Sequence, residues 1–92
     1  MKRVDAQILI LLRHFTRLTD ILQLRQGLVQ SGSSVSLVLL RSANVPPACL
    51  EALNGLPCCT VDPWLAEHLD IPLLSAEELA HRVIQADLVM PC

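Results

Sequence analysis

At residues 75–92 the chain reads SAEELAHRVIQADLVMPC, a helix pattern that passes directly into a strand pattern. Ser75 and Glu78 have the spacing of a capping box, in which each side chain accepts a hydrogen bond from the backbone N–H of the other residue. Leu74 and Leu79 flank this box as a hydrophobic staple. Apolar residues then recur at helical spacing, at Ala76, Leu79, Ala80 and Val83, before the short apolar run 88–90. We therefore expect a helix that is followed by a buried strand.

The same alternation extends back towards residue 8. Strands are predicted at residues 8–12, 35–40, 57–61, 71–74 and 88–90, with a helix in each interval. The run 8–12 is apolar throughout, which is typical of a strand covered on both faces. Gly32 suits the end of a helix, and Pro47 suits the first position of one. Asp62 suits an N-cap. This order predicts an α/β fold with a five-stranded, mainly parallel sheet.

Composition limits what the protein can be. The chain has 92 residues, of which 52% are hydrophobic and 17% are charged. We expect one domain over residues 1–92, which would bury about 60% of the surface that its unfolded chain exposes. Few polar side chains remain to cover so small a body, which favours a homo- or hetero-oligomer. The net charge of −2 and the scattered Lys and Arg residues give no basic face, so we expect no nucleic-acid binding.

The apolar run 6–12, which follows Lys2 and Arg3, is the segment most similar to an export signal. Arg13 and His14 interrupt it, and no small-residue cleavage site follows. Its length is also far short of the roughly 20 residues that span a bilayer. We therefore expect a cytoplasmic protein that does not bind a membrane.

Four cysteines, Cys49, Cys58, Cys59 and Cys92, raise the question of disulfides. We expect reduced thiols, because disulfide-rich scaffolds compensate for a weak core and this chain is rich in Leu, Val and Ile. Neighbours on a strand point to opposite faces, so Cys58 and Cys59 fit neither a redox pair nor a metal site, and no metal is predicted. Both are expected in the core. Cys49 should pack inward from a helix, and Cys92 should lie at an exposed chain end.

In an open parallel sheet the default ligand site is the crevice at the carboxyl ends of the strands. The residues predicted there are His14, Phe15, Arg41, Asn44, Asp62 and Trp64. The chain has neither G-x-G-x-x-G nor a Walker loop, and we predict no cofactor. His14 could act as an acid or base, or simply cap its strand. Trp64 could anchor an interface or pack in the core.

Residues 56–71, LPCCTVDPWLAEHLDI, together with residues 75–92 and the order of elements, resemble the small DsrE/DsrF/DsrH family. That family includes the TusB, TusC and TusD sulfur-relay subunits. The resemblance covers most of the chain and is one of pattern. It implies a three-layer α/β/α sandwich with a five-stranded sheet and assembly into dimers, trimers or hexamers. It also implies transfer of persulfide sulfur between cytoplasmic carrier proteins, for tRNA thiolation or sulfur oxidation.

The resemblance also implies a position for the sulfur-carrying cysteine, just after the third strand at the start of the next short helix. That position falls near Asp62, and a carboxylate cannot form a persulfide. The nearest thiols, Cys58 and Cys59, lie within the strand. The DsrH and TusB type lacks the carrier cysteine and acts as a partner subunit.

Three hypotheses follow. The preferred one is an interaction subunit of a sulfur-relay assembly that does not itself hold sulfur. The second is a persulfide-carrying sulfurtransferase that uses Cys59, Cys58 or Cys92. The third is an unrelated α/β module that binds a small ligand in the crevice near His14, Arg41, Asp62 and Trp64.

Overall fold

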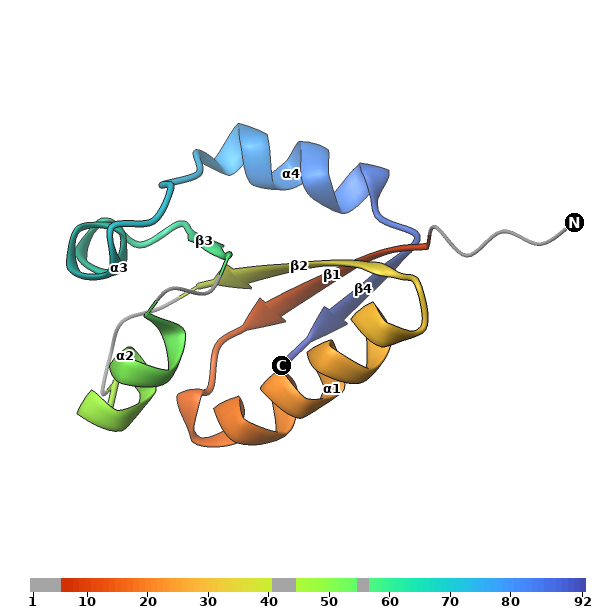
Figure 1. Ribbon diagram of the computed structural model, residues 1–92. Helices are drawn as coiled ribbons and strands as arrows, with labels where there is room; N and C mark the ends of the chain where they lie inside the picture. The colour runs from red at the N-terminus through yellow and green to blue at the C-terminus, as the bar shows by residue number, and fades with distance from the viewer. Residues whose placement is uncertain (1–5, 41–44, 55–56) are drawn as a thin grey trace, which may run out of the picture.

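A parallel sheet lies at the centre of the molecule, with four strands among the described residues (Figure 1). The computed structural model describes residues 6–40, 45–54 and 57–92. The strands are β1 (Gln7–Leu12), β2 (Ser34–Leu39), β3 (Cys59–Thr60) and β4 (Leu88–Pro91). The helices are η1 (Phe15–Arg17), a 3₁₀ turn, and α1 (Leu18–Gln30), α2 (Pro47–Leu53), α3 (Pro63–Leu69) and α4 (Ala76–Gln85). The predicted α/β class with parallel strands is confirmed.

The strands lie in the order β3-β2-β1-β4, and every pair is parallel. In the register, Gln7 of β1 lies opposite Ser34 of β2, and Ile8 lies opposite Leu88 of β4. β1 is therefore flanked on both sides, which explains why its sequence is an almost unbroken apolar run. The last strand was predicted to be buried, but β4 lies at an edge of the sheet and none of its residues is buried.

The fifth strand predicted at residues 71–74 does not form. Leu73 makes a single isolated parallel bridge with Thr60. The Thr60 N–H donates to the carbonyl oxygen of Pro72, and the Leu74 N–H donates to that of Thr60. The segment cannot extend this pairing into a strand, because Pro72 has no N–H and β3 is only two residues long. The five-stranded sheet is thus replaced by four strands and one bridge in the described part of the chain.

One face of the sheet carries the larger apolar cluster, which α1, α2 and α3 help to form. Its buried members are Ile8, Ile10, Leu12, Phe15, Leu18, Ile21, Leu37, Leu39, Leu53 and Leu65. The strand members alternate along β1 and β2, as side chains on one face of a sheet must. Phe15, predicted to lie in the crevice, belongs to this core and is only 5% exposed.

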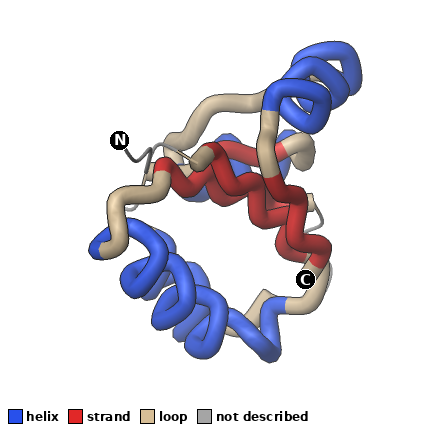
Figure 2. Tube along the Cα trace, turned by 90° about the vertical axis from the view of Figure 1, so that its right-hand side faces the viewer, coloured by secondary structure: helices blue, strands red, loops and turns tan. Residues whose placement is uncertain are grey.

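The opposite face is covered by α4, so that helices lie on both sides of the sheet (Figures 1 and 2). The cluster here is smaller, with Leu9, Val38, Cys59 and Leu74 buried. From α4 only Leu79 and the C-cap residue Ala86 pack against it, and no side chain of α4 is fully buried. The apolar face predicted for this helix was too wide, because Ala76, Ala80 and Val83 are exposed. The cover on this face is thin.

The predicted helix ends are confirmed where local chemistry sets them. The Ser75 hydroxyl accepts from the Glu78 N–H at 3.1 Å, and the Glu78 carboxylate accepts from the Ser75 N–H at 2.9 Å. Asp62 caps α3 by accepting from the Trp64 N–H at 2.8 Å. Gly32 follows α1 with a φ of 96°, a conformation that a side chain disfavours. Among the helices that the structure describes, none is both long and apolar enough to cross a membrane.

Candidate functional site

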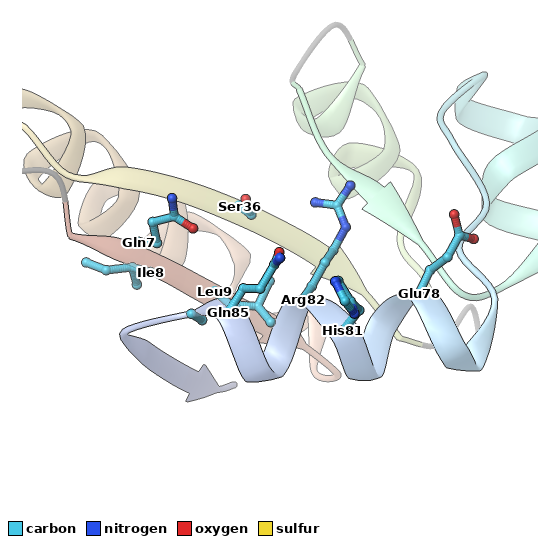
Figure 3. A pocket seen from close by; sticks show the side chains of 9 residues that line it. Gln7, Ile8, Leu9, Ser36, Glu78, His81, Arg82 and Gln85 are labelled. Atoms are coloured by element: carbon cyan, nitrogen blue, oxygen red, sulfur yellow. The ribbon is translucent and has the colours of Figure 1, made fainter.

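Two adjoining hollows lie between α4 and the sheet, and Figure 3 shows the first of them. The first has a volume of about 460 Å³ and is lined by Gln7, Ile8, Leu9, Ser36, Glu78, His81, Arg82, Gln85 and Ala86. The second, of about 370 Å³, is lined by Val35, Ser36, Leu37, Pro57, Cys58, Cys59, Pro72 and Arg82. Because Ser36 and Arg82 line both, we treat them as one groove and call it the α4 groove. Both volumes lie in the range of small-molecule sites.

The polar wall of the α4 groove comes from the spacing of residues along α4. Glu78, His81, Arg82 and Gln85 follow one another at intervals of three, one and three, which places them on one side of a helix. Leu79 lies on the neighbouring side and holds the helix against the smaller cluster. The polar stripe is therefore turned along the sheet and not only towards solvent, as Figure 3 shows.

The floor of the groove is the sheet near the amino ends of β1 and β2. Ser36 lies opposite Leu9 in the register, on the face that α4 covers. It is half-buried. In the described part of the chain its hydroxyl has no hydrogen-bond partner. The next β2 side chain on the same face is Val38, which is apolar and buried. A polar, unpaired group thus interrupts an apolar floor.

Arg82 is the strongest charge at the groove. Its side chain extends from α4 across the gap towards β2 and β3 (Figure 3). Within the described residues it forms no ion pair or hydrogen bond through its guanidinium group. The acid in the wall, Glu78, is held by its capping box, and hydrogen bonds from Ser75 lower the pKa of its carboxyl group.

Cys58 and Cys59 both line the second hollow, but their packing differs. Cys59 packs in the smaller cluster and Cys58 against the larger one, which confirms that they face opposite sides of the sheet. Burial raises the pKa of both thiols, and the nearby charge of Arg82 offsets part of this rise at Cys59. The thiol of Cys59 donates to the Leu37 carbonyl oxygen at 3.8 Å. These are the features of core cysteines with little thiolate at neutral pH.

The other two cysteines lie apart from the groove. Cys49 packs inward from α2, as predicted, and its thiol lies 3.5 Å from the Phe15 carbonyl oxygen. Cys92 was expected at an exposed end. Instead it is half-buried against the larger cluster, because its N–H donates to the Leu11 carbonyl oxygen at 2.7 Å.

The residues predicted for the crevice are not brought together as one site. His14 is exposed beyond β1, at the start of η1. Asp62 caps α3, and Trp64 is 42% exposed and stacks on His68 with ring centroids 3.9 Å apart. Arg41 and Asn44 lie outside the described residues. The α4 groove lies instead towards the amino ends of β1 and β2.

Sequence reasoning missed Gln7, Ser36, His81, Arg82 and Gln85 as lining residues. Two signals were available. Ser36 is the one polar residue in the run 35–40, and the stripe on α4 is as regular as its apolar side. Neither signal alone says that the two surfaces face each other.

Comparisons with protein-family models, with curated proteins and with solved structures found no match to the chain. Within the described residues, no three His, Cys, Asp or Glu side chains lie close enough together to hold a metal ion.

Proposed function

We propose that this protein is a cytoplasmic interaction subunit of the DsrE type, which takes part in a persulfide-relay assembly through contact and does not itself carry sulfur. The observation that carries the proposal is the presence of exposed apolar side chains on α4 and on the edge strand β4. Val83 and Ile84 of α4 are 37% and 80% exposed, and Leu88 of β4, on the sheet face opposite α4, is 52% exposed. We call these three residues the α4–β4 corner.

Strand β4 gives the corner a means of pairing. It is the last strand in the order β3-β2-β1-β4, and its outer edge pairs with no strand among the described residues. Cys92 donates its N–H to Leu11 of β1, so by alternation along the register the backbone N–H and C=O of Val89 and the C=O of Pro91 are directed outward. An edge that presents unpaired backbone groups beside apolar side chains favours addition of another strand. A second copy of the chain, joined edge to edge, fits this surface.

The thiols support a subunit that does not carry sulfur. Asp62 is the second residue after β3, directly before α3, and its carboxylate caps that helix. Cys59 lies before it, is 7% exposed, and has a pKa raised by burial. A persulfide forms by attack of a thiolate on a sulfur donor, and a buried thiol with a raised pKa is a poor nucleophile.

The first test is the state of association in solution, measured by sedimentation equilibrium. We expect a dimer whose dissociation constant rises about tenfold or more in Ile84→Glu and in Leu88→Glu, because each places a charge in an apolar contact. Val29→Glu is the matched control, since Val29 is 46% exposed on α1, away from the corner. A wild-type protein that stays monomeric, or equal weakening by the control, contradicts this proposal.

The second test is sulfur loading. The protein is incubated with a persulfidated cysteine desulfurase, and its peptides are searched by mass spectrometry for the added mass of one sulfur atom. We expect none at the peptides that contain Cys58, Cys59 or Cys92. Sulfur on one of them that passes to an acceptor protein would establish the carrier function instead.

A further inference from the structure

We propose that the α4 groove binds a small amphipathic anion, with its carboxylate or phosphate group at Arg82 and Ser36 and its apolar part in the second hollow. This inference does not depend on the proposed role in a sulfur relay. Residues of β1, β2 and α4, and residues near β3, place polar groups in the first hollow and apolar groups in the second.

The anionic end would meet groups that can donate hydrogen bonds. Arg82 offers a guanidinium group that is free of partners in the described residues, and such a group binds carboxylates and phosphates through two parallel hydrogen bonds. Ser36 offers a hydroxyl group from the floor, and Gln7 and Gln85 offer side-chain amides from β1 and α4. His81 adds a further donor from the wall.

The apolar end would lie in the second hollow. Pro57, Pro72 and Cys59 line it with apolar atoms, and Val35 and Leu37, whose side chains pack on the other face of the sheet, border it. Arg82 lines both this hollow and the polar first hollow. A ligand that is charged at one end and apolar at the other matches a polar hollow that adjoins an apolar one. A free inorganic anion would leave the second hollow unused, and a neutral alcohol would leave Arg82 unpaired.

Glu78 makes it possible to predict an increase as well as a decrease in the affinity for the anion. Its carboxylate is a fixed negative charge in the same wall, so it repels an anion in the groove. Glu78→Gln removes this charge while the amide oxygen still accepts from the Ser75 N–H. The anion should therefore bind more tightly to Glu78→Gln and more weakly to Arg82→Gln, whereas two variants that merely loosened α4 would both weaken binding.

The test is a titration of the ¹⁵N-labelled protein, followed by NMR, with hexanoate, hexyl phosphate, hexanol and inorganic phosphate. We expect hexanoate or hexyl phosphate to shift the amide signals of β2 and α4, with affinity about tenfold or more weaker in Arg82→Gln and several-fold tighter in Glu78→Gln. Arg17→Gln, an exposed change on η1, should leave the affinity unchanged.

The four probes separate the possible outcomes. Binding of hexanoate alone identifies a carboxylate site, and binding of hexyl phosphate alone identifies a phosphate site. Hexanol binding as tightly as the two anions, equal affinities in all variants, or no shifts with either anion would overturn the proposal. Inorganic phosphate that bound as tightly as hexyl phosphate would overturn the role of the second hollow.

Discussion

Gln7 and Asp87 hold each other through two hydrogen bonds, although 80 positions separate them in the chain. The Gln7 N–H donates to Oδ2 of Asp87 at 2.8 Å, and the Asp87 N–H donates to the carbonyl oxygen of Gln7 at 2.8 Å. The pair joins the start of β1 to the start of β4. It also fixes the end of the α4 groove that Gln7 lines.

Removing the Asp87 side chain should therefore weaken the attachment of β4. We expect Asp87→Ala to lower the free energy of unfolding by about 1 kcal/mol, the usual net contribution of one hydrogen bond. Asp87→Asn keeps an acceptor oxygen and should retain most of the stability. Urea unfolding followed by circular dichroism measures both, and an Asp87→Asn variant as unstable as Asp87→Ala would contradict the role of the acceptor.

Thr60 is the buried polar residue of β3 and should be sensitive to change. Its hydroxyl donates to the Leu39 carbonyl oxygen at 2.6 Å and accepts from the Asp62 N–H at 3.0 Å. Thr60→Val keeps the shape but leaves both groups unsatisfied, so we expect a loss of about 2 kcal/mol in the free energy of unfolding. Thr60→Ser keeps the hydroxyl and should lose less. Equal losses in the two variants would mean that packing, and not hydrogen bonding, governs this site.

The capping box of α4 should make stability depend on pH on the acid side. Backbone and side-chain hydrogen bonds from Ser75 lower the pKa of Glu78 below its ordinary value of 4.5. The stabilisation is therefore complete above that value and is lost as the pH falls through the lower pKa of the folded state. Melting temperatures of the wild type and Glu78→Gln between pH 6 and pH 3 should converge or cross as the pH falls, because Gln does not titrate. Parallel curves would show that Glu78 contributes no pH dependence.

The reactivity of each of the two neighbouring thiols, Cys58 and Cys59, should depend on a different arginine. Burial raises the pKa of Cys58 and Cys59 above the ordinary value of 9.0, so both should react slowly with iodoacetamide near neutral pH and faster as the pH rises. Arg82 lowers the pKa of Cys59 and Arg25 lowers that of Cys58. Arg82→Gln should therefore slow alkylation at Cys59 only, and Arg25→Gln at Cys58 only.

Mass spectrometry of the alkylated peptides reads the two cysteines separately through their fragment ions. The urea-unfolded protein gives the rate without burial. A Cys59 that reacted as fast in the folded as in the unfolded protein would show that it is not protected.

Much of the fold was predictable because local chemistry sets it. The capping box at Ser75, the N-cap at Asp62 and the apolar run that became β1 each leave a signature within a few residues. The third strand was predicted at 57–61 but spans only Cys59–Thr60, and residues 71–74 form one bridge. Strand length depends on the partner, and no local pattern reports how long the partner is.

The candidate site could not be predicted because it depends on how a helix is turned on a sheet. The α4 sequence has an apolar side and a polar side, and the usual reading assigns the polar side to solvent. In the structure Leu79 sets the contact, and the stripe that includes Arg82 faces the groove instead. Ser36, which interrupts an apolar strand, was the residue that could have pointed to this face.

Because α4 covers the sheet only thinly, its exposed side chains can be changed without disturbing the core on which folding depends. None of the α4 side chains is fully buried, whereas Leu9 and Val38 on the sheet face beneath are at most 2% exposed. Exposed positions tolerate replacement within about 0.5 kcal/mol, while core positions do not. Residues 81, 82 and 85 can therefore diversify with little effect on the sheet. A family of variants with one scaffold and many groove chemistries could be selected by randomising these three positions alone.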